Sequence, residues 1–89
     1  MEPEVAFGLV LRELRLRKGM SQEKLALEAE IERNYISLLE LGKNSASVKK
    51  IFSLASALGV GVAEFMGMVE DRLKAVDLPP VIRSGTGES

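Results

Sequence analysis

Cysteine and histidine are both absent from the 89 residues of the chain. Without cysteine there is neither a disulfide framework nor a thiolate nucleophile. Without histidine as well, the chain lacks the usual ligands of a zinc site and the imidazole group that serves many acid–base catalysts. The sequence therefore predicts no metal site, no cofactor and no enzymatic activity.

Long apolar runs are missing too, because none approaches the roughly 20 residues that cross a bilayer. The first residues, Met1–Glu4, are acidic where a secretion signal would be basic. We therefore expect a cytoplasmic protein with no membrane contact. Hydrophobic residues make up 46% and charged residues 28% of the chain, which is typical of one small folded domain with a single core.

Charge is nearly balanced, since 12 Lys and Arg stand against 13 Asp and Glu, for a net charge of −1. Such a balance argues against nonspecific coating of nucleic acid. The distribution is more informative than the sum, because basic residues crowd at positions 12–18 and 43–50. The first of these clusters could equally be a solvated helix end that complements the helix dipole.

Helical periodicity runs through almost the whole chain, and no alternating strand pattern is present. In the first segment, apolar residues recur at the spacing of a helix stripe, at Phe7, Val10, Leu11 and Leu14. Glycines at 19, 42 and 59 stand where helices end, and serines at 21 and 47 stand where helices begin. These signals predict an all-α domain of five short helices.

The last predicted helix covers residues 63–76 and is ended by prolines at 79 and 80. We expect a domain of residues 1–78 that includes this helix. Residues 79–89, rich in serine and glycine, are expected to form a flexible C-terminal tail.

The second and third predicted helices form a distinctive pair between Gln22 and Leu41. Each has about eight or nine residues, and only three or four residues join them. Small or aliphatic side chains flank the turn, and Ala26 lets the two helices approach closely at a steep angle. A pair that crosses at roughly 90–120° is a helix-turn-helix, whose second helix can enter the major groove of DNA.

Three stretches carry a resemblance to a known family: MSQEKLA at 20–26, IERNYISLLELGKN at 31–44 and LASALGV at 54–60. With these stretches in this order and spacing, residues 5–66 resemble the lambdoid Cro and repressor helix-turn-helix family, the XRE family. The resemblance implies a five-helix, lambda-repressor-like DNA-binding domain. Residues 32–37 further resemble restriction–modification controller proteins.

The resemblance implies roles for eight residues in contact with double-stranded DNA: Gln22, Arg33, Asn34, Tyr35, Ser37, Leu38, Lys43 and Asn44. Gln22 would bind phosphate at a helix N-terminus. Arg33, Asn34 and Leu38 would face base edges, with Ser37 beside them. Arginine can recognise guanine and asparagine can recognise adenine. Tyr35 would be mainly a packing residue whose hydroxyl reaches solvent or phosphate. Lys43 would grip the DNA backbone from the loop after the recognition helix, together with Asn44.

Two further positions follow from the resemblance. Arg12 is implied to pair with Glu40, joining the first helix to the third. Glu30 stands where the family usually has a glycine of positive φ, which costs about 1 kcal/mol and implies a slightly different turn.

A single recognition helix covers only about four or five base pairs, so we expect a homodimer on a palindromic operator, without a small-molecule ligand. The apolar stripe expected to form the dimer contact comprises Phe65, Val69, Leu73 and Val76. In this interpretation Phe65 is partly in the core, while Val69 and Leu73 lie at the two-fold axis. In the alternative, Phe65 and Val69 complete the core of the monomer and leave too little surface for a stable dimer.

The predicted function is therefore sequence-specific transcriptional regulation, by an autoregulating phage repressor, a restriction–modification controller or an antitoxin. Two alternatives on the same fold remain open at this point. The domain could serve chiefly as an antitoxin that binds a toxin, or as a protein-interaction module whose DNA-binding face has decayed.

Overall fold

The protein is described by a computed structural model that covers the backbone of residues 1–77 and the side chains of residues 1–75. Within this part the chain forms five helices and no strand: α1 (Pro3–Arg17), α2 (Gln22–Ala29), α3 (Arg33–Glu40), α4 (Val48–Leu58) and α5 (Val62–Asp77). The all-α prediction is confirmed, and α5 is one residue longer at each end than expected. The expected tail, residues 79–89, and the side chain of Val76 lie outside the described residues.

Local sequence signals set the helix boundaries. The hydroxyl of Ser21 accepts a hydrogen bond from the backbone N–H of Lys24 at 3.0 Å, and the hydroxyl of Ser47 accepts one from that of Lys50 at 3.3 Å. These bonds satisfy N–H groups that have no partner within the first turn of a helix. Both serine caps were predicted from the sequence and are confirmed.

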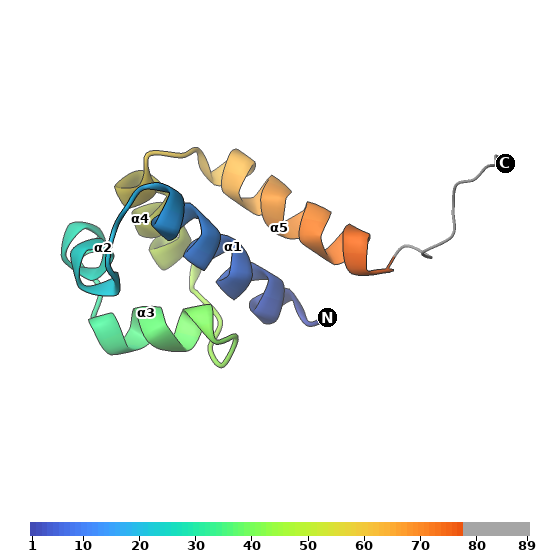
Figure 1. Ribbon diagram of the computed structural model, residues 1–89, viewed down its shortest axis with the longest axis horizontal. Coiled ribbons are helices and arrows are strands. Elements are labelled where there is room, and N and C mark those ends of the chain that lie inside the picture. The colour runs from blue at the N-terminus through green and yellow to red at the C-terminus, as the bar shows by residue number, and fades with distance from the viewer. Residues whose placement is uncertain (78–89) are drawn as a thin grey trace, which may run out of the picture.

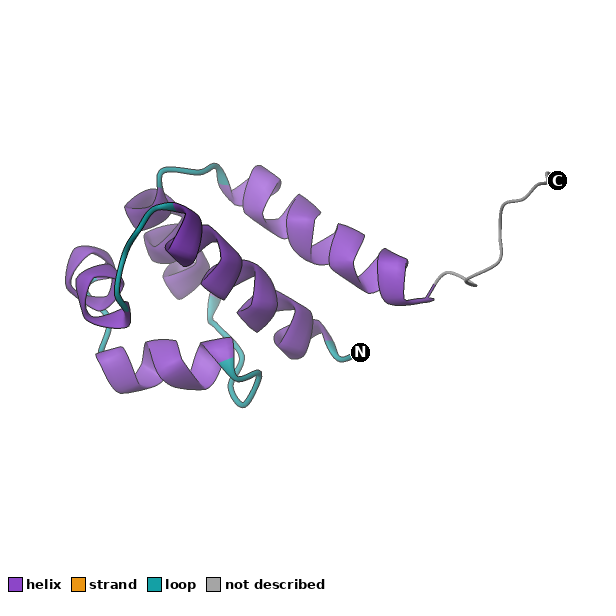
Figure 2. Ribbon diagram, in the orientation of Figure 1, coloured by secondary structure: helices purple, strands orange, loops and turns teal. Residues whose placement is uncertain are grey.

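The helices pack around α1. In Figure 1, α1 and α5 run side by side in opposite directions, so the N-terminus and the end of α5 lie at the same end of the molecule. On its other side α1 contacts α3, while α2 bridges α3 and α4. The all-helical arrangement, joined by short loops, is seen in Figure 2.

The core is formed by apolar side chains from all five helices. Within it the rings of Phe7 and Phe65 are in contact, with centroids 5.0 Å apart and planes inclined by 32°. Phe65 is 0% exposed and Val69 is 4% exposed, and both belong to this core. The expectation that Val69 lies at a two-fold axis is therefore wrong, because α1 covers this side of α5 within the protomer.

A close approach between α1 and α3 fixes the orientation of α3. A Cβ atom at Gly8 would overlap the carbonyl oxygen of Leu39, so only glycine allows this contact. After α3 the chain turns at Gly42, whose φ of +74° is a left-handed conformation and whose Cα faces Val5. The position of α3 is thus determined by backbone packing against α1.

Among the described helices, no single one is long and apolar enough to cross a membrane. Only α4 and α5 together reach that length and composition, and they are bent by 103° at the break between them. Both helices contribute buried side chains to the core.

Candidate nucleic-acid interface

The second and third helices form the predicted helix-turn-helix. α2 ends in a turn at Glu30, with φ 58° and ψ 45°, where the backbone N–H of Ile31 donates to the carbonyl of Ala26 at 3.0 Å. Among the described residues, Glu30 is the only non-glycine with positive φ. The expectation of a different turn is therefore wrong, because Glu30 itself adopts the left-handed conformation that a glycine would favour.

α3 is anchored on one side and exposed on the other. Ile36 and Leu39 are both 0% exposed and hold the helix to the core. Arg33, Asn34 and Leu38 are exposed, Arg33 in the first turn of the helix and Asn34 and Leu38 on the side away from the core. The structure thus presents the three residues that were expected to face base edges, and Ser37 lies half-buried beside them.

Tyr35 connects the recognition helix to the loop that follows it. Its hydroxyl donates a hydrogen bond to the carbonyl oxygen of Ser45 at 2.7 Å, and its half-buried ring packs against the core. The ammonium group of Lys50 lies 5.2 Å from the centre of the ring, within range of a cation–π interaction. In this structure the hydroxyl therefore holds the loop.

The loop between α3 and α4 carries Lys43 and Asn44, the two residues expected to grip the DNA backbone. Lys43 is exposed and Asn44 is half-buried. The N–H of Lys43 donates to the carbonyl of Leu38 at 3.0 Å, which ties the start of the loop to α3. Lys49 and Lys50 follow at the start of α4, and Lys50 is the one of them with a contact to α3, over the ring of Tyr35.

Glu40 pairs with Arg15, and the expected pairing with Arg12 is wrong. Arg15 donates from Nε and Nη2 to the two carboxylate oxygens of Glu40, at 2.6 and 3.0 Å, and from Nη1 to the carbonyl of Met20 at 2.8 Å. Arg12 is exposed, because it lies off the buried stripe of α1. Arg15 follows Leu11 by four residues on that stripe, a spacing that could have identified it in the sequence.

Burial and hydrogen bonding make the Arg15–Glu40 pair a rigid junction. The hydrogen bond with Glu40 raises the pKa of the Arg15 guanidinium above its ordinary value. Burial acts in the opposite direction, while attraction to the carboxylates of Glu40 and Glu23 adds to the increase. The guanidinium therefore stays charged and keeps its partner.

Gln22, at the first position of α2, belongs to the same junction. Its Nε2 donates to Oε1 of Glu40 at 3.0 Å, and its side chain is half-buried. Glu40 thereby orients the amide of Gln22 near the N-terminus of α2, where backbone N–H groups favour an anion. The sequence singled out Gln22, but its contact with Glu40 depends on how α2 and α3 cross.

Arg33 has a partner that the sequence did not indicate. Its Nε lies 3.1 Å from Oε2 of Glu23 on α2, and both side chains are largely exposed. This contact spans the turn between the two helices, so no spacing within a single helix predicts it.

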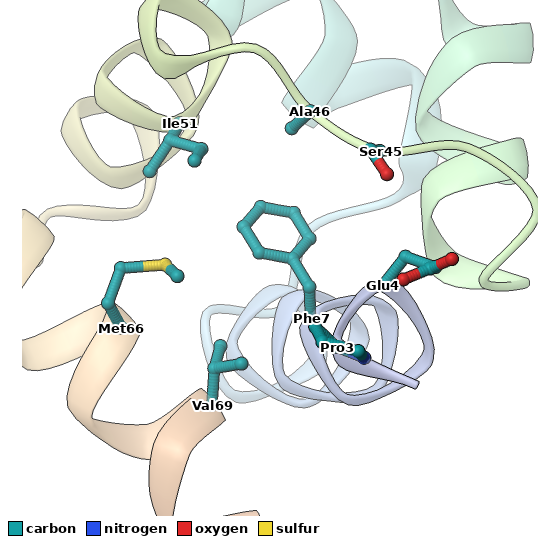
Figure 3. A pocket seen from close by; sticks show the side chains of 8 residues that line it. All are labelled: Pro3, Glu4, Phe7, Ser45, Ala46, Ile51, Met66 and Val69. Atoms are coloured by element: carbon teal, nitrogen blue, oxygen red, sulfur yellow. The ribbon is translucent and has the colours of Figure 1, made fainter. Parts of the chain in front are cut away.

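A cavity of about 170 Å³ lies between α1, the loop before α4, α4 and α5 (Figure 3). Apolar side chains form most of its wall, and Glu4 and Ser45 lie on the same side of it in Figure 3. The lining residues are Pro3, Glu4, Phe7, Ser45, Ala46, Ile51, Met66 and Val69. No group of three or more His, Cys, Asp or Glu side chains within the described part of the chain is arranged to hold a metal ion.

A helix-turn-helix family model matches residues 11–65, which include α2, the turn and α3. The chain belongs to the XRE-type helix-turn-helix family of DNA-binding transcription regulators. The XRE-type assignment made from the sequence is thereby confirmed.

Relatives of this XRE-type domain include restriction–modification control proteins. Control protein C.BamHI of Bacillus amyloliquefaciens is 47% identical over 55 residues, which are 61% of this chain and 68% of that protein. The controller C.AhdI of Aeromonas hydrophila superposes with a TM-score of 0.68 at 42% identity, over 70% of this chain and 94% of that one.

A third relative has been solved with DNA. The controller C.Esp1396I, as a tetramer bound to its natural 35-base-pair operator, superposes with a TM-score of 0.76 at 27% identity. The match covers 83% of this chain and 97% of that chain. These relatives are regulatory proteins rather than enzymes.

Proposed function

We propose that this protein is a transcriptional regulator of the restriction–modification controller type, which binds a palindromic operator as a homodimer. The observation that carries the proposal is the exposed face of α3, where Arg33 and Asn34 project from a helix that Ile36 and Leu39 anchor in the core. The similarity to C.BamHI, C.AhdI and operator-bound C.Esp1396I supports this assignment.

The chemistry of this face suits the major groove. A guanidinium can donate two hydrogen bonds to O6 and N7 of guanine, and an asparagine amide can pair with N6 and N7 of adenine. Leu38, whose exposed fraction is 37%, offers an apolar contact for a thymine methyl group. Arg33 and Asn34 would therefore supply base recognition.

Contacts with phosphate would come from the two ends of this surface. Gln22 lies at the N-terminus of α2, and Lys43 lies in the loop after α3. Such contacts add affinity for all sequences and set the register of the protein on DNA. Lys43→Ala should weaken binding to all duplexes and reduce the slope of log K against log salt by about one unit.

Selection of bound duplexes from a random library, followed by mobility-shift titration, tests operator binding. We expect one enriched palindrome, and binding to random duplex that is weaker by several orders of magnitude. Enrichment of no sequence, with equal affinity for all duplexes, would contradict the proposal.

The homodimer requires a different surface from the one predicted. Because Phe65 and Val69 are buried, the surface that α5 leaves open beside Pro3 is formed by Ala63, Met66, Gly67 and Glu70, with half-buried Leu73 at its edge. Pro3 of α1 lies next to this surface, which forms a shallow depression. Small side chains at Ala63 and Gly67 allow a second helix to approach closely. We propose this side of α5 as the dimer contact.

Substitution at Gly67 tests this placement without disturbing the protomer. A Cβ atom at Gly67 would have no neighbour within 4 Å, so Gly67→Glu should fold normally while placing a charge in the proposed contact. We expect sedimentation equilibrium to show monomers for this variant and dimers for the wild type.

Ala75→Glu is the matched control, because Ala75 is exposed on another side of α5. It should leave the dimer intact. Dimers that persist in Gly67→Glu would exclude this side of α5. Val69→Asp cannot serve as a test, because it would place a charge in the core and unfold the protomer.

A further inference from the structure

The ion pair between Glu23 and Arg33 lies within the proposed DNA-binding surface, between the start of α2 and the start of α3. Glu23 is the second residue of α2 and Arg33 is the first residue of α3, and their side chains meet at 3.1 Å across the turn. The Arg33 side chain is 52% exposed and that of Glu23 is 68% exposed. A pair so accessible to water contributes little to the free energy of unfolding. Its effect is therefore expected on the binding of Arg33 to DNA.

The geometry leaves part of the guanidinium free. Arginine carries five N–H donors, and the Glu23 contact is with Nε. The two Nη groups, which donate together to O6 and N7 of guanine, remain available. A carboxylate at Nε therefore restrains the side chain in an orientation compatible with a bidentate base contact.

The same carboxylate opposes contact with phosphate. Binding to random DNA depends on attraction between cationic side chains and the phosphate backbone. Glu23 neutralises Arg33 locally, and its negative charge is repelled by phosphate. On the correct site, a guanine offers Arg33 two hydrogen bonds, whereas on random DNA Arg33 gains only an electrostatic contact that Glu23 weakens.

We propose that Glu23 is a specificity-determining residue, which restrains Arg33 for a guanine contact and lowers its affinity for phosphate. Specificity is a difference of affinities, and weakening the wrong complex raises it as effectively as strengthening the correct one. This inference rests on the proposed operator binding, with Arg33 as a base-contacting residue.

Another glutamate of α2 provides a matched control. Glu28 forms an ion pair with Lys24 at 3.1 Å, one turn apart on the same helix, and has no ion pair with a residue of α3. Glu23→Gln and Glu28→Gln each remove one negative charge from the exposed side of α2. Only Glu23→Gln removes the carboxylate that pairs with Arg33.

The experiment compares the full-length wild type with both variants, on the selected operator and on random duplex at the same ionic strength. We expect Glu23→Gln to tighten binding to random duplex by about three- to tenfold, and binding to the operator by less. The ratio of the two affinities should therefore fall. Glu28→Gln should change both affinities by the same factor and leave the ratio intact.

Removal of Arg33 provides a second readout. In an Arg33→Ala background, Glu23→Gln should have the same effect as Glu28→Gln, because the side chain that it restrains is gone. A specificity ratio that stays at the wild-type value in Glu23→Gln, or that falls equally in Glu28→Gln, would overturn the inference while leaving operator binding established. A wild-type protein without sequence preference would overturn both.

Discussion

Two arginine–glutamate pairs attach α3 to its neighbouring helices, and one is buried while the other is exposed. Arg15 and Glu40 join α1 to α3, with side chains only 9% and 4% exposed and two hydrogen bonds between them. Arg33 and Glu23 join α3 to α2 through a single contact of 3.1 Å, with both side chains at least half exposed. The chemical groups are the same, and the surroundings differ.

The difference shows how burial assigns roles to identical groups. A buried pair cannot lose one member without leaving an uncompensated charge away from water. The role of Arg15 and Glu40 is therefore to stabilise the folded state. An exposed pair can exchange its partner for water or for DNA at little cost. One junction thus fixes the position of the recognition helix, and the other remains free to take part in recognition.

The largest expected effect comes from breaking the buried junction. Arg15→Ala should lower the free energy of unfolding by about 3–5 kcal/mol, because Glu40 would remain buried without its partner. Urea denaturation followed by circular dichroism measures this loss. Arg12→Ala is the control and should change stability by less than about 0.5 kcal/mol, since Arg12 is exposed. Equal losses in the two variants would contradict the assignment of Arg15 as the partner.

Breaking the exposed pair should weaken DNA binding and leave the stability of the fold nearly unchanged. Arg33→Ala should cost about 1–3 kcal/mol in operator binding and relax specificity at one base pair, while stability stays within about 0.5 kcal/mol of the wild type. Titration of operators with single base-pair changes, together with urea denaturation, separates the two effects. An equal loss of affinity on random duplex would show that Arg33 contacts only phosphate.

Tyr35 is intermediate in burial between the two ion pairs, because its ring is half-buried. Its hydroxyl donates a hydrogen bond to the carbonyl oxygen of Ser45 in the loop. Tyr35→Phe keeps the ring and removes this hydrogen bond, so the free energy of unfolding should fall by about 1 kcal/mol. Amide hydrogen exchange should become faster in residues 43–46, which the bond holds. Unchanged exchange there would show that the loop is fixed by other contacts.

The smallest effect concerns the turn that carries the exposed pair. Glu30→Gly should raise the free energy of unfolding by about 0.5–1 kcal/mol, because glycine adopts the left-handed conformation of Glu30 without strain. Glu28→Gly, in the last turn of α2, should lower stability, since glycine loses more backbone entropy in a helix. Thermal denaturation of the two variants should therefore shift in opposite directions.

Helix boundaries and the exposed face of α3 could be predicted from the sequence, because the signals that define them are local. A serine hydroxyl caps the helix that begins next to it, as Ser21 and Ser47 do. The spacing of Ile36 and Leu39 turns one side of α3 inward and leaves Asn34 and Leu38 outside.

The partners of charged residues in other helices could not be predicted from such local signals. Arg15 lies on the buried stripe of α1 and Arg12 lies off it, so periodicity favours Arg15 as the inward residue, but only the packing of α3 against Gly8 brings Glu40 to meet it. The partner of Arg33 likewise depends on how α2 and α3 cross, and a steep crossing predicted from the sequence does not show which side chains meet.

The sequence by itself determined the five helices, the helix-turn-helix and the residues that face outward from α3, because periodicity and capping act within a few residues. Only the tertiary structure decided which side of α5 is covered. Phe65, Val69 and Leu73 form one continuous apolar stripe, and nothing in their spacing shows how far α1 extends over it. The packing of α1 buries Phe65 and Val69 and leaves Leu73 half-buried, because burial depends on the shape of the neighbouring helix as well as on the helix that carries the stripe.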